Sequence, residues 1–310
     1  MKFSLFTLLL LFTSFSVFGN PAPEKRATRL PADLDTEDGI VFKEVEGQKL
    51  VFTLFRPLEK KYDNSPLLVY IHGGGWGGGD RFKVTRSGII DVIRGLNKEG
   101  ITCASIEYRL VDGKPTTAAD AVADCKDAVR YFVKNAETYG IDPDRIGTFG
   151  SSAGGHLTLV TALGKDDDYP CDPAFDGPEY TIRCVASYYP QVSFTDRPLM
   201  TVGNFRRPQR LIPLLGGPLE EHRDMAQLLS PIDLITLDSP AIFLAHGDAD
   251  TVLSVDNAIA MEKAAKEKDV PVECVISKGA GHGFSGAAID PTLEEITGRT
   301  LSFLLKYLAH

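Results

Sequence analysis

From about residue 66 onward, short apolar runs alternate with amphipathic segments, and this alternation constrains the fold more than any other feature of the chain. The amphipathic segments span residues 117–140 and 251–269, and their apolar residues recur at three- and four-residue spacing, as on one face of a helix. The apolar runs read PLLVYIH, ITCASIEYRL, DRIGTFG, RCVASYYP, PAIFLAHG and VECVISKG. Continuous apolar strands separated by such helices predict an α/β fold with a mostly parallel central sheet and helices on both faces.

Two stretches depart from this alternation. The runs GIVFKEV and KLVFTLFRP, before residue 58, have strand character with no helix between them, which indicates an antiparallel lead-in. Residues 165–230 are irregular and break repeatedly at Pro and Gly. We expect this stretch to be a cap or loop insertion that contacts substrate; the alternative is a surface excursion with no role.

The first residues have the composition of a secretory signal. Lys2 precedes the largely apolar stretch 3–18, and small residues lie before position 20. We therefore expect a signal peptide at 1–19, a linker at 20–36 and one catalytic domain at 37–310, in a secreted or periplasmic protein without stable membrane insertion after cleavage. The alternative is an uncleaved anchor, because 16 such residues nearly span a bilayer.

Composition narrows the partners and the redox chemistry. The chain of 310 residues carries a formal net charge of −9 and no Lys/Arg cluster, so nucleic acid is not an expected partner. Of five cysteines, Cys171 and Cys184 flank a polar loop and are the most plausible disulfide pair in an exported protein. Cys103 and Cys274 lie in apolar runs and are expected to be buried thiols. No CxxC or CxH spacing indicates a metal site.

The segment IGTFGSSAGGHL, residues 146–157, contains the pattern G-x-S-x-G only if Ser152, and not Ser151, is the central serine. This pattern is typical of a sharp strand-to-helix turn that holds a nucleophilic serine above the sheet. The flanking residues agree, since DRIGTF reads as a strand and HLTLVTAL as a helix. Ser152 is therefore the candidate nucleophile.

A serine hydroxyl needs a base, and the base needs an orienting carboxylate; this turn design requires the chain order serine, acid, histidine. Asp248 and Asp250 follow one predicted strand, and His282 follows the next, at the sheet edge where Ser152 lies. We favour Asp250 over Asp248, which is suited to forming the turn. His156 and His246 are expected to pack internally.

The segment YIHGGGWGGGDR, residues 70–81, follows a strand and exposes bare glycine amides. Gly74, Gly75 and Ala153 are the expected donors to the negative oxygen that forms when an ester is attacked. The same loop also satisfies G-x-G-x-x-G, the nucleotide-binding pattern. That alternative is disfavoured because Asp80 and Arg81 follow the glycines where an apolar helix should begin.

These motifs together resemble a known family. HGGGW at 72–76, EYRL at 107–110, GSSAGG at 150–155, HGDAD at 246–250 and GHGF at 281–284 resemble the α/β-hydrolase carboxylesterases related to hormone-sensitive lipase. They are most similar to the exported branch that includes acetyl-xylan and feruloyl esterases. The resemblance covers about residues 40–308 and implies the α/β-hydrolase fold, with Ser152, Asp250 and His282 as catalytic triad. It also implies framework charges at Arg109 and Asp124.

The expected function is therefore an exported serine carboxylesterase that hydrolyses short-chain or carbohydrate-linked esters through an acyl-enzyme, with no metal or organic cofactor. Trp76 and Tyr108 are candidate contacts for a sugar or an aromatic acyl group, although both residues would equally suit packing beneath the site. Two alternatives stay open: a serine peptidase of the same fold and a non-catalytic binding protein. The sequence does not give the oligomeric state.

Overall fold

The computed structural model of the protein describes residues 30–113, 115–177, 179–200, 203 and 207–310. The expected signal peptide at 1–19 and most of the expected linker at 20–36 lie outside the described residues. The first strand begins at Asp35, two residues before the expected start of the domain. In the described part of the chain, no helix combines the length and apolar character needed to cross a membrane.

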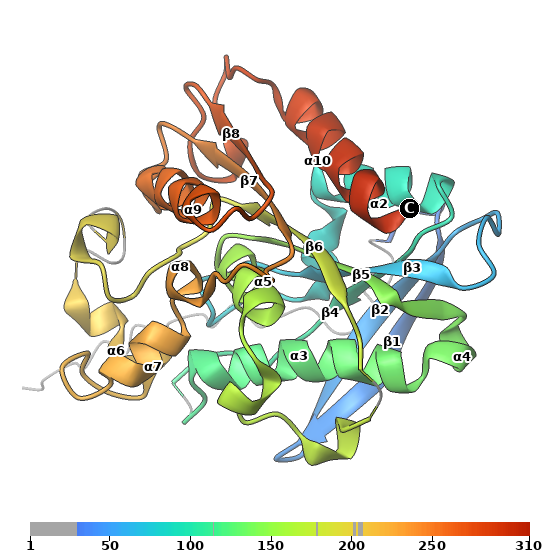
Figure 1. The fold of residues 1–310 in the computed structure, drawn as a ribbon, viewed down its shortest axis with the longest axis horizontal. Helices are drawn as coiled ribbons and strands as arrows, with labels where there is room; N and C mark the ends of the chain where they lie inside the picture. The colour runs from blue at the N-terminus through green and yellow to red at the C-terminus, as the bar shows by residue number, and fades with distance from the viewer. Residues whose placement is uncertain (1–29, 114, 178, 201–202, 204–206) are drawn as a thin grey trace, which may run out of the picture.

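The described strands form one eight-stranded sheet in the order β1-β2-β4-β3-β5-β6-β7-β8 (Figure 1). β1 pairs with β2, and β2 with β4, in antiparallel register, whereas all later pairs are parallel. The mostly parallel sheet and the antiparallel lead-in are therefore as predicted. The strands are β1 (Asp35–Val45), β2 (Gln48–Arg56), β3 (Ser65–Ile71), β4 (Thr102–Ile106), β5 (Ile141–Ser151), β6 (Ile182–Tyr188), β7 (Ala241–Gly247) and β8 (Val272–Ser277).

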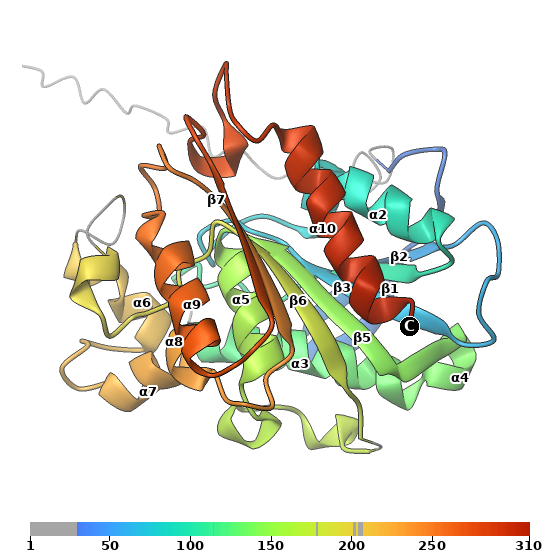
Figure 2. The same ribbon diagram turned by 45° about the horizontal axis from the view of Figure 1, so that its top comes forward.

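Helices cover both faces of the sheet (Figures 1 and 2). Because β3 is apolar on both faces, it needs helices on both: Leu67 and Val69 pack toward α3 and α5, whereas Leu68 and Tyr70 pack toward α2 and α10. α9 lies on the same face as α5, beside β7 and β8. These helices are α2 (Ile89–Lys98), α3 (Ala118–Lys134), α5 (Ala153–Leu163), α9 (Asp256–Glu267) and α10 (Leu293–Leu308).

The longest helices begin at capping boxes that the sequence encodes. The Thr117 hydroxyl accepts from the Asp120 amide, and the Asp120 carboxylate accepts from the Thr117 amide; Thr292 and Glu295 do the same for α10. The segment predicted as one helix at 117–140 divides at Asn135, after which the short α4 (Ala136–Tyr139) ends at Gly140.

The irregular stretch 165–230 divides into two parts with different places in the fold. Its first part lies near the amino end of β5, where the Thr181 amide donates to the Pro143 carbonyl. Its second part, which we call the cap segment (residues 207–229), packs on the α3 and α5 side and reaches Ser152. The short elements here and just beyond are η2 (Asp166–Asp168), η3 (Pro173–Phe175), η4 (Arg197–Met200), η6 (Pro208–Arg210), α6 (Ile212–Leu215), α7 (Arg223–Leu228) and α8 (Pro231–Leu234).

The cysteine prediction is partly wrong. Cys171 and Cys184 are not bonded, and all five thiols are free. Cys184 lies on β6 in the apolar layer beneath α10, whereas Cys171 packs against the layer beneath α3, so the sheet separates the two. Cys103 is buried as predicted, and Cys274 is only partly buried.

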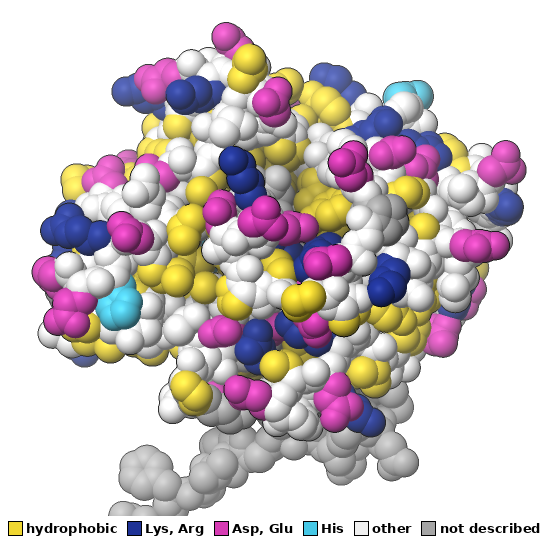
Figure 3. Space-filling model, turned by 60° about the horizontal axis from the view of Figure 1, so that its bottom comes forward, with side chains coloured by type: hydrophobic (Ala, Val, Ile, Leu, Met, Phe, Trp, Pro, Cys, Tyr) yellow, Lys and Arg dark blue, Asp and Glu magenta, His cyan; other side chains and the backbone are white. Residues whose placement is uncertain are grey.

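Acidic and basic side chains are interspersed with apolar ones on the face that Figure 3 shows, and no continuous basic patch is visible there. This mixed surface agrees with the acidic net charge of the chain.

Candidate active site

The sharp turn between β5 and α5 positions Ser152. β5 ends at Ser151 and α5 begins at Ala153, so Ser152 alone makes the turn, with φ 58° and ψ −124°. A Cβ at Gly150 would lie 2.1 Å from the Gly154 carbonyl oxygen, and one at Gly154 would lie 2.1 Å from the Ile71 carbonyl oxygen, which explains why glycine stands two residues on either side of Ser152. The Ser152 amide donates to the Tyr188 carbonyl at 2.9 Å and ties the turn to β6.

Three side chains from distant segments form one hydrogen-bonded chain at the carboxyl edge of the sheet. Nδ1 of His282 lies 2.7 Å from Oδ2 of Asp250, and Nε2 of His282 lies 3.0 Å from Oγ of Ser152. A proton on Nδ1, facing the carboxylate, leaves Nε2 free to accept from the hydroxyl. The structure thus brings together the three residues that the sequence selects for nucleophile, base and acid.

The carboxylate of Asp250 is almost fully enclosed by donors. Its Oδ1 accepts from the amides of Val252 and Leu253 at 2.7 and 3.0 Å, and its Oδ2 faces His282 and His246. Burial opposes ionisation of Asp250, but the hydrogen bonds from His246, His282 and the Leu253 amide hold the pKa of its carboxyl well below its usual range. Asp250 is therefore ionised at neutral pH and can stabilise a cationic imidazole.

Asp248, the less favoured candidate, has a different position. Its carboxylate is exposed and accepts from the Gly279 amide at 2.7 Å, which links the turns after β7 and β8. This contact agrees with the predicted turn-forming role.

His246 is a second imidazole on the same carboxylate, although the sequence predicts only internal packing for it. It is fully buried at the end of β7, and its Nε2 lies 3.0 Å from the Leu253 carbonyl and 3.3 Å from Oδ2 of Asp250. The spacing H-G-x-x-D, with histidine four residues before the acid, is the signal that would have identified it.

The loop at residues 72–79, here called the glycine loop, lies directly against the turn that carries Ser152. A side chain at Gly74 has no space, because its Cβ would lie 1.8 Å from the Gly78 carbonyl oxygen. Within the described residues, the amides of Gly74, Gly75 and Ala153 donate to no backbone or side-chain acceptor. Such amides beside a serine are suited to binding a developing oxyanion. The glycine loop leads into the short 3₁₀ helix η1 (Arg81–Thr85), and α2 begins only at Ile89, whereas in a dinucleotide-binding fold the glycine turn opens directly into the helix.

Tyr108 anchors the glycine loop, and its prediction as a substrate contact is wrong. The Tyr108 side chain is 1% exposed, its ring stacks on His72 at 4.4 Å between centroids, and its hydroxyl donates to the His72 carbonyl at 2.8 Å. Lys83 donates to the Gly73 carbonyl at 2.8 Å from the other side. These contacts fix the loop before any substrate arrives.

Trp76 lines the pocket beside Ser152 and is held by His156, one turn into α5. The Trp76 indole N–H donates to Nδ1 of His156 at 3.1 Å, and Nε2 of His156 donates to the Leu229 carbonyl at 2.7 Å. Burial lowers the pKa of His156 to about 4, so the imidazole is neutral and makes both bonds at neutral pH. His156 is internal, as predicted.

A small cavity of about 70 Å³ adjoins Ser152 and Gly75. Its walls are mainly apolar and come from the glycine loop, the segments after β4 and β7, and the cap segment; they include Trp76, Val111, Leu214 and Leu253. The prediction that the irregular stretch contacts the site therefore has its structural counterpart in the cap segment, and Arg210 lies there too.

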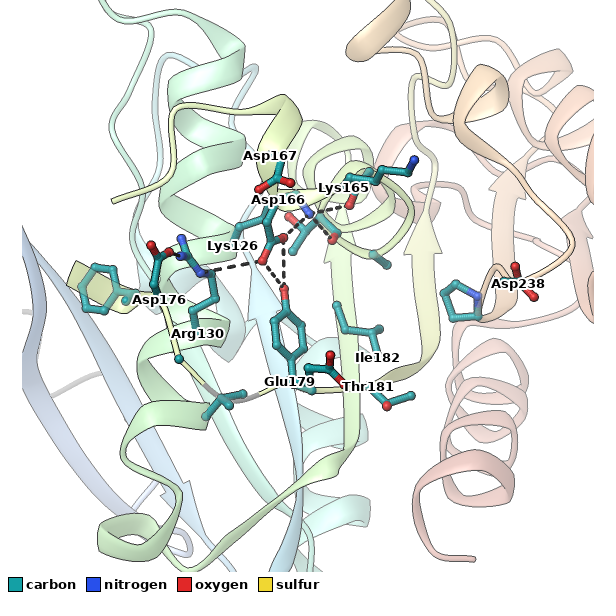
Figure 4. A pocket seen from close by; sticks show the side chains of 18 residues that line it. Lys126, Arg130, Lys165, Asp166, Asp167, Asp176, Glu179, Thr181, Ile182 and Asp238 are labelled. Carbon is teal, nitrogen blue, oxygen red and sulfur yellow. Dashed lines mark hydrogen bonds and ion pairs between the residues drawn. The ribbon is translucent and has the colours of Figure 1, made fainter. Parts of the chain in front are cut away.

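A larger cavity, of about 650 Å³, lies at the opposite end of the sheet from Ser152, and Figure 4 shows it from close by. Three of its charged side chains face one another: Lys126 and Arg130 converge on Asp166, which also accepts from the Tyr180 hydroxyl at 3.0 Å. It is lined from the amino ends of β6 and β7, whereas Ser152 lies at the carboxyl edge, so this cavity is separate from the candidate active site.

Arg109 and Asp124 form the expected structural ion pair. Two hydrogen bonds, at 2.7 and 3.0 Å, join the guanidinium to the carboxylate, and Lys43 contacts the same carboxylate at 2.7 Å. Asp124 is fully buried, so this pair links β1, α3 and the segment after β4.

A family model and individual relatives of this chain both indicate esterases. The BD-FAE family matches residues 53–265. Esterase LipC of Mycobacterium tuberculosis is 27% identical over 236 residues, which cover 75% of this chain and 57% of that protein. Carboxylesterase NlhH of the same species is 28% identical over 264 residues, covering 79% of this chain and 75% of that one. The chain spans about half the length of LipC and of the two other mycobacterial esterases LipM and LipQ.

Among solved structures, a propionate-bound esterase from Thermogutta terrifontis, Est2, superposes with a TM-score of 0.71 at 25% identity. The match covers 89% of this chain and 96% of that one. The similarity therefore extends over most of the chain.

Proposed function

The chain belongs to the BD-FAE family of α/β hydrolases, and from that premise we propose that it is a serine carboxylesterase. One observation carries the proposal: the unbroken hydrogen-bonded chain from the Ser152 hydroxyl through His282 to Asp250. The free amides beside Ser152 and the similarity to the esterases LipC and NlhH support it.

The proposed mechanism is a two-step acyl transfer. Nε2 of His282 accepts the Ser152 proton while Oγ attacks the ester carbonyl, and the imidazolium is stabilised by the ionised Asp250. The amides of Gly74, Gly75 and Ala153 hold the oxyanion, a contribution of about 3 kcal/mol for each donor. His282 then returns the proton to the leaving alcohol, and water activated by the same nitrogen hydrolyses the acyl-enzyme.

We propose a short acyl group. The cavity beside Ser152, about 70 Å³, is far smaller than the roughly 300–1,000 Å³ of pockets for drug-sized ligands. Its walls are apolar, and the similar esterase of Thermogutta terrifontis has a propionate-bound structure. Within the acetyl and feruloyl classes expected from the sequence, this size favours acetyl.

The natural alcohol is proposed to be a carbohydrate outside the cell. The composition of residues 1–19, typical of a secretory signal, and the sequence resemblance to acetyl-xylan esterases support this. The buried edge of Trp76 is a wall of the acyl pocket, which leaves the sugar to bind nearer the open mouth.

A panel of esters tests the proposal. The enzyme should hydrolyse 4-nitrophenyl acetate and propionate fastest, with rates falling from butyrate to octanoate; acetylated xylan and methyl ferulate extend the panel to the carbohydrate question. The Ser152→Ala variant is the negative control for each ester. Aminoacyl 4-nitroanilides in the same panel test the peptidase alternative. Absence of all hydrolysis by the wild type would favour a binding protein instead.

A further inference from the structure

One cation stands at the cavity beside Ser152 and has no part in the proposed mechanism. Arg210, at the end of η6, lines the same cavity as Ser152 and Gly75. Among the residues that the structure describes, it is the one charged residue in the cavity lining. The rest of the lining, including Trp76 and Leu214, is apolar or backbone. A guanidinium beside a small acyl pocket bears on which esters the site accepts.

The local fold holds Arg210 toward the cavity. Arg210, Pro213 and Leu214 have the spacing i, i+3, i+4, and all three line the cavity, as expected for one face of a helical turn. The side of this helical turn that faces away from the cavity is fixed, because Leu211 and Leu215 are buried and the Leu215 amide donates to the Leu211 carbonyl at 2.8 Å. The backbone that carries Arg210 is therefore anchored in the core.

Arg210 has no acidic partner in the described part of the protein. Arg81, Arg109 and Arg130 each pair with at least one carboxylate, whereas no ion pair or hydrogen bond joins Arg210 to any described side chain, and no Asp or Glu lines the cavity among these residues. The net charge of −9 repels an anionic ligand at long range, so binding one at this site needs a local cation.

We propose, resting on the esterase function above, that Arg210 binds a carboxylate of the substrate, so that the enzyme selects esters with a carboxylate close to the scissile bond. The planar guanidinium fork matches a carboxylate in two parallel hydrogen bonds, and the exposed Arg210 side chain is open to an incoming anion. The carboxylate belongs either to a short dicarboxylic acyl group or to the alcohol; both place the same anion near Arg210.

Two pairs of esters test this proposal, and the rate of their hydrolysis is measured by pH-stat titration. Monomethyl succinate against methyl pentanoate puts the charge on the acyl side, and acetoxyacetate against propyl acetate puts it on the alcohol side. For the charged member of one pair, Arg210→Gln should lower kcat/KM about tenfold, as for a hydrogen bond to a charged group, and leave the uncharged member within about twofold. The pair that responds identifies the side that carries the carboxylate.

The matched control is Arg207→Gln, which removes an exposed positive charge three residues away that does not line the cavity. It should change none of the four values by more than about twofold. An equal loss for charged and uncharged esters in Arg210→Gln, no loss, or the same loss in Arg207→Gln would each overturn the proposal. A wild type that hydrolyses no ester of either pair contradicts the esterase function instead, which separates the two failures.

Discussion

The indole N–H of Trp76 donates a hydrogen bond to Nδ1 of His156, 80 residues away in the chain. Because Nε2 of His156 also donates to the Leu229 carbonyl, one neutral, buried imidazole joins the glycine loop, α5 and the cap segment. All three segments contribute to the surroundings of Ser152. Their relative placement therefore depends on the His156 imidazole, which is not part of the cavity lining; the contact of His156 with Ser152 is a backbone hydrogen bond, from the His156 amide to the Ser152 carbonyl at 3.0 Å.

We predict that His156→Phe lowers kcat more than it raises KM on 4-nitrophenyl acetate, by about tenfold or more. The displaced Trp76 would carry the neighbouring Gly74 and Gly75 amides away from the oxyanion, which exists only in the transition state. His156→Gln, which keeps one acceptor and one donor, should recover most of the lost rate. Equal losses in both variants, or a change in KM alone, would contradict a positioning role.

The two buried imidazoles of His72 and His156 predict a stability that falls on mild acidification. Burial lowers the pKa of each to about 4, against 6.5 in the unfolded chain. Between these values the unfolded chain binds more protons, so stability is complete above pH 6.5 and decreases as the pH falls toward 4. At pH 5 each histidine should cost about 2 kcal/mol of unfolding free energy.

Urea unfolding at pH 7 and pH 5 tests this, with His156→Gln as comparison. The variant should lose about 2 kcal/mol less than the wild type between the two pH values. Asp250 does not interfere, because its pKa is lowered from 3.8 and its contribution is lost only at more acidic pH. The same pH dependence in both proteins would show that His156 is not the titrating group.

Asp250→Asn should reduce kcat/KM by about 10³–10⁴, because the amide no longer holds the His282 tautomer or stabilises its cation. Asp248→Asn is the matched control, since it removes a carboxylate charge two residues away on a side chain that accepts from the Gly279 amide in the neighbouring turn. It should keep the rate within about threefold. A reversed order of the two variants would assign the acid to Asp248.

Val111 is expected to set the depth of the acyl pocket, and it is only half-buried, so substitution should spare the fold. Val111→Ala should raise the ratio of hexanoate to acetate hydrolysis by several-fold, and Val111→Leu should lower it, since one methylene is worth about 1–3 kcal/mol in such a pocket. The measurement is kcat/KM across 4-nitrophenyl esters. Shifts in the same direction for both variants would place the acyl chain elsewhere.

Much of the architecture follows from the sequence alone. The apolar runs predict the six later strands, because a strand buried on both faces must be continuously apolar, and the antiparallel lead-in follows from two runs without a helix between them. The juxtaposition of Ser152, Asp250 and His282 follows from one rule: parallel strands bring their carboxyl ends to the same edge.

The sequence fails where a side chain's role depends on which neighbour it meets. Tyr108 looks like a substrate contact by proximity to the site, but its hydroxyl finds the His72 carbonyl and its ring is buried. Cys171 and Cys184 are near in sequence, yet the sheet lies between them. Arg210 is in a stretch without recognisable periodicity, and its place beside Ser152 depends on how α6 packs in the core.

The most direct test of Ser152 as the nucleophile labels the protein with a fluorophosphonate and identifies the modified residue by peptide mass spectrometry, beside ester hydrolysis. We predict one label, on Ser152, with label and hydrolysis both lost in Ser152→Ala and both kept in Ser151→Ala, whose hydroxyl faces Tyr70 at 3.3 Å instead of His282. A label on another residue, or one that survives Ser152→Ala, would contradict the assignment of the nucleophile. Equal loss in both variants would do the same.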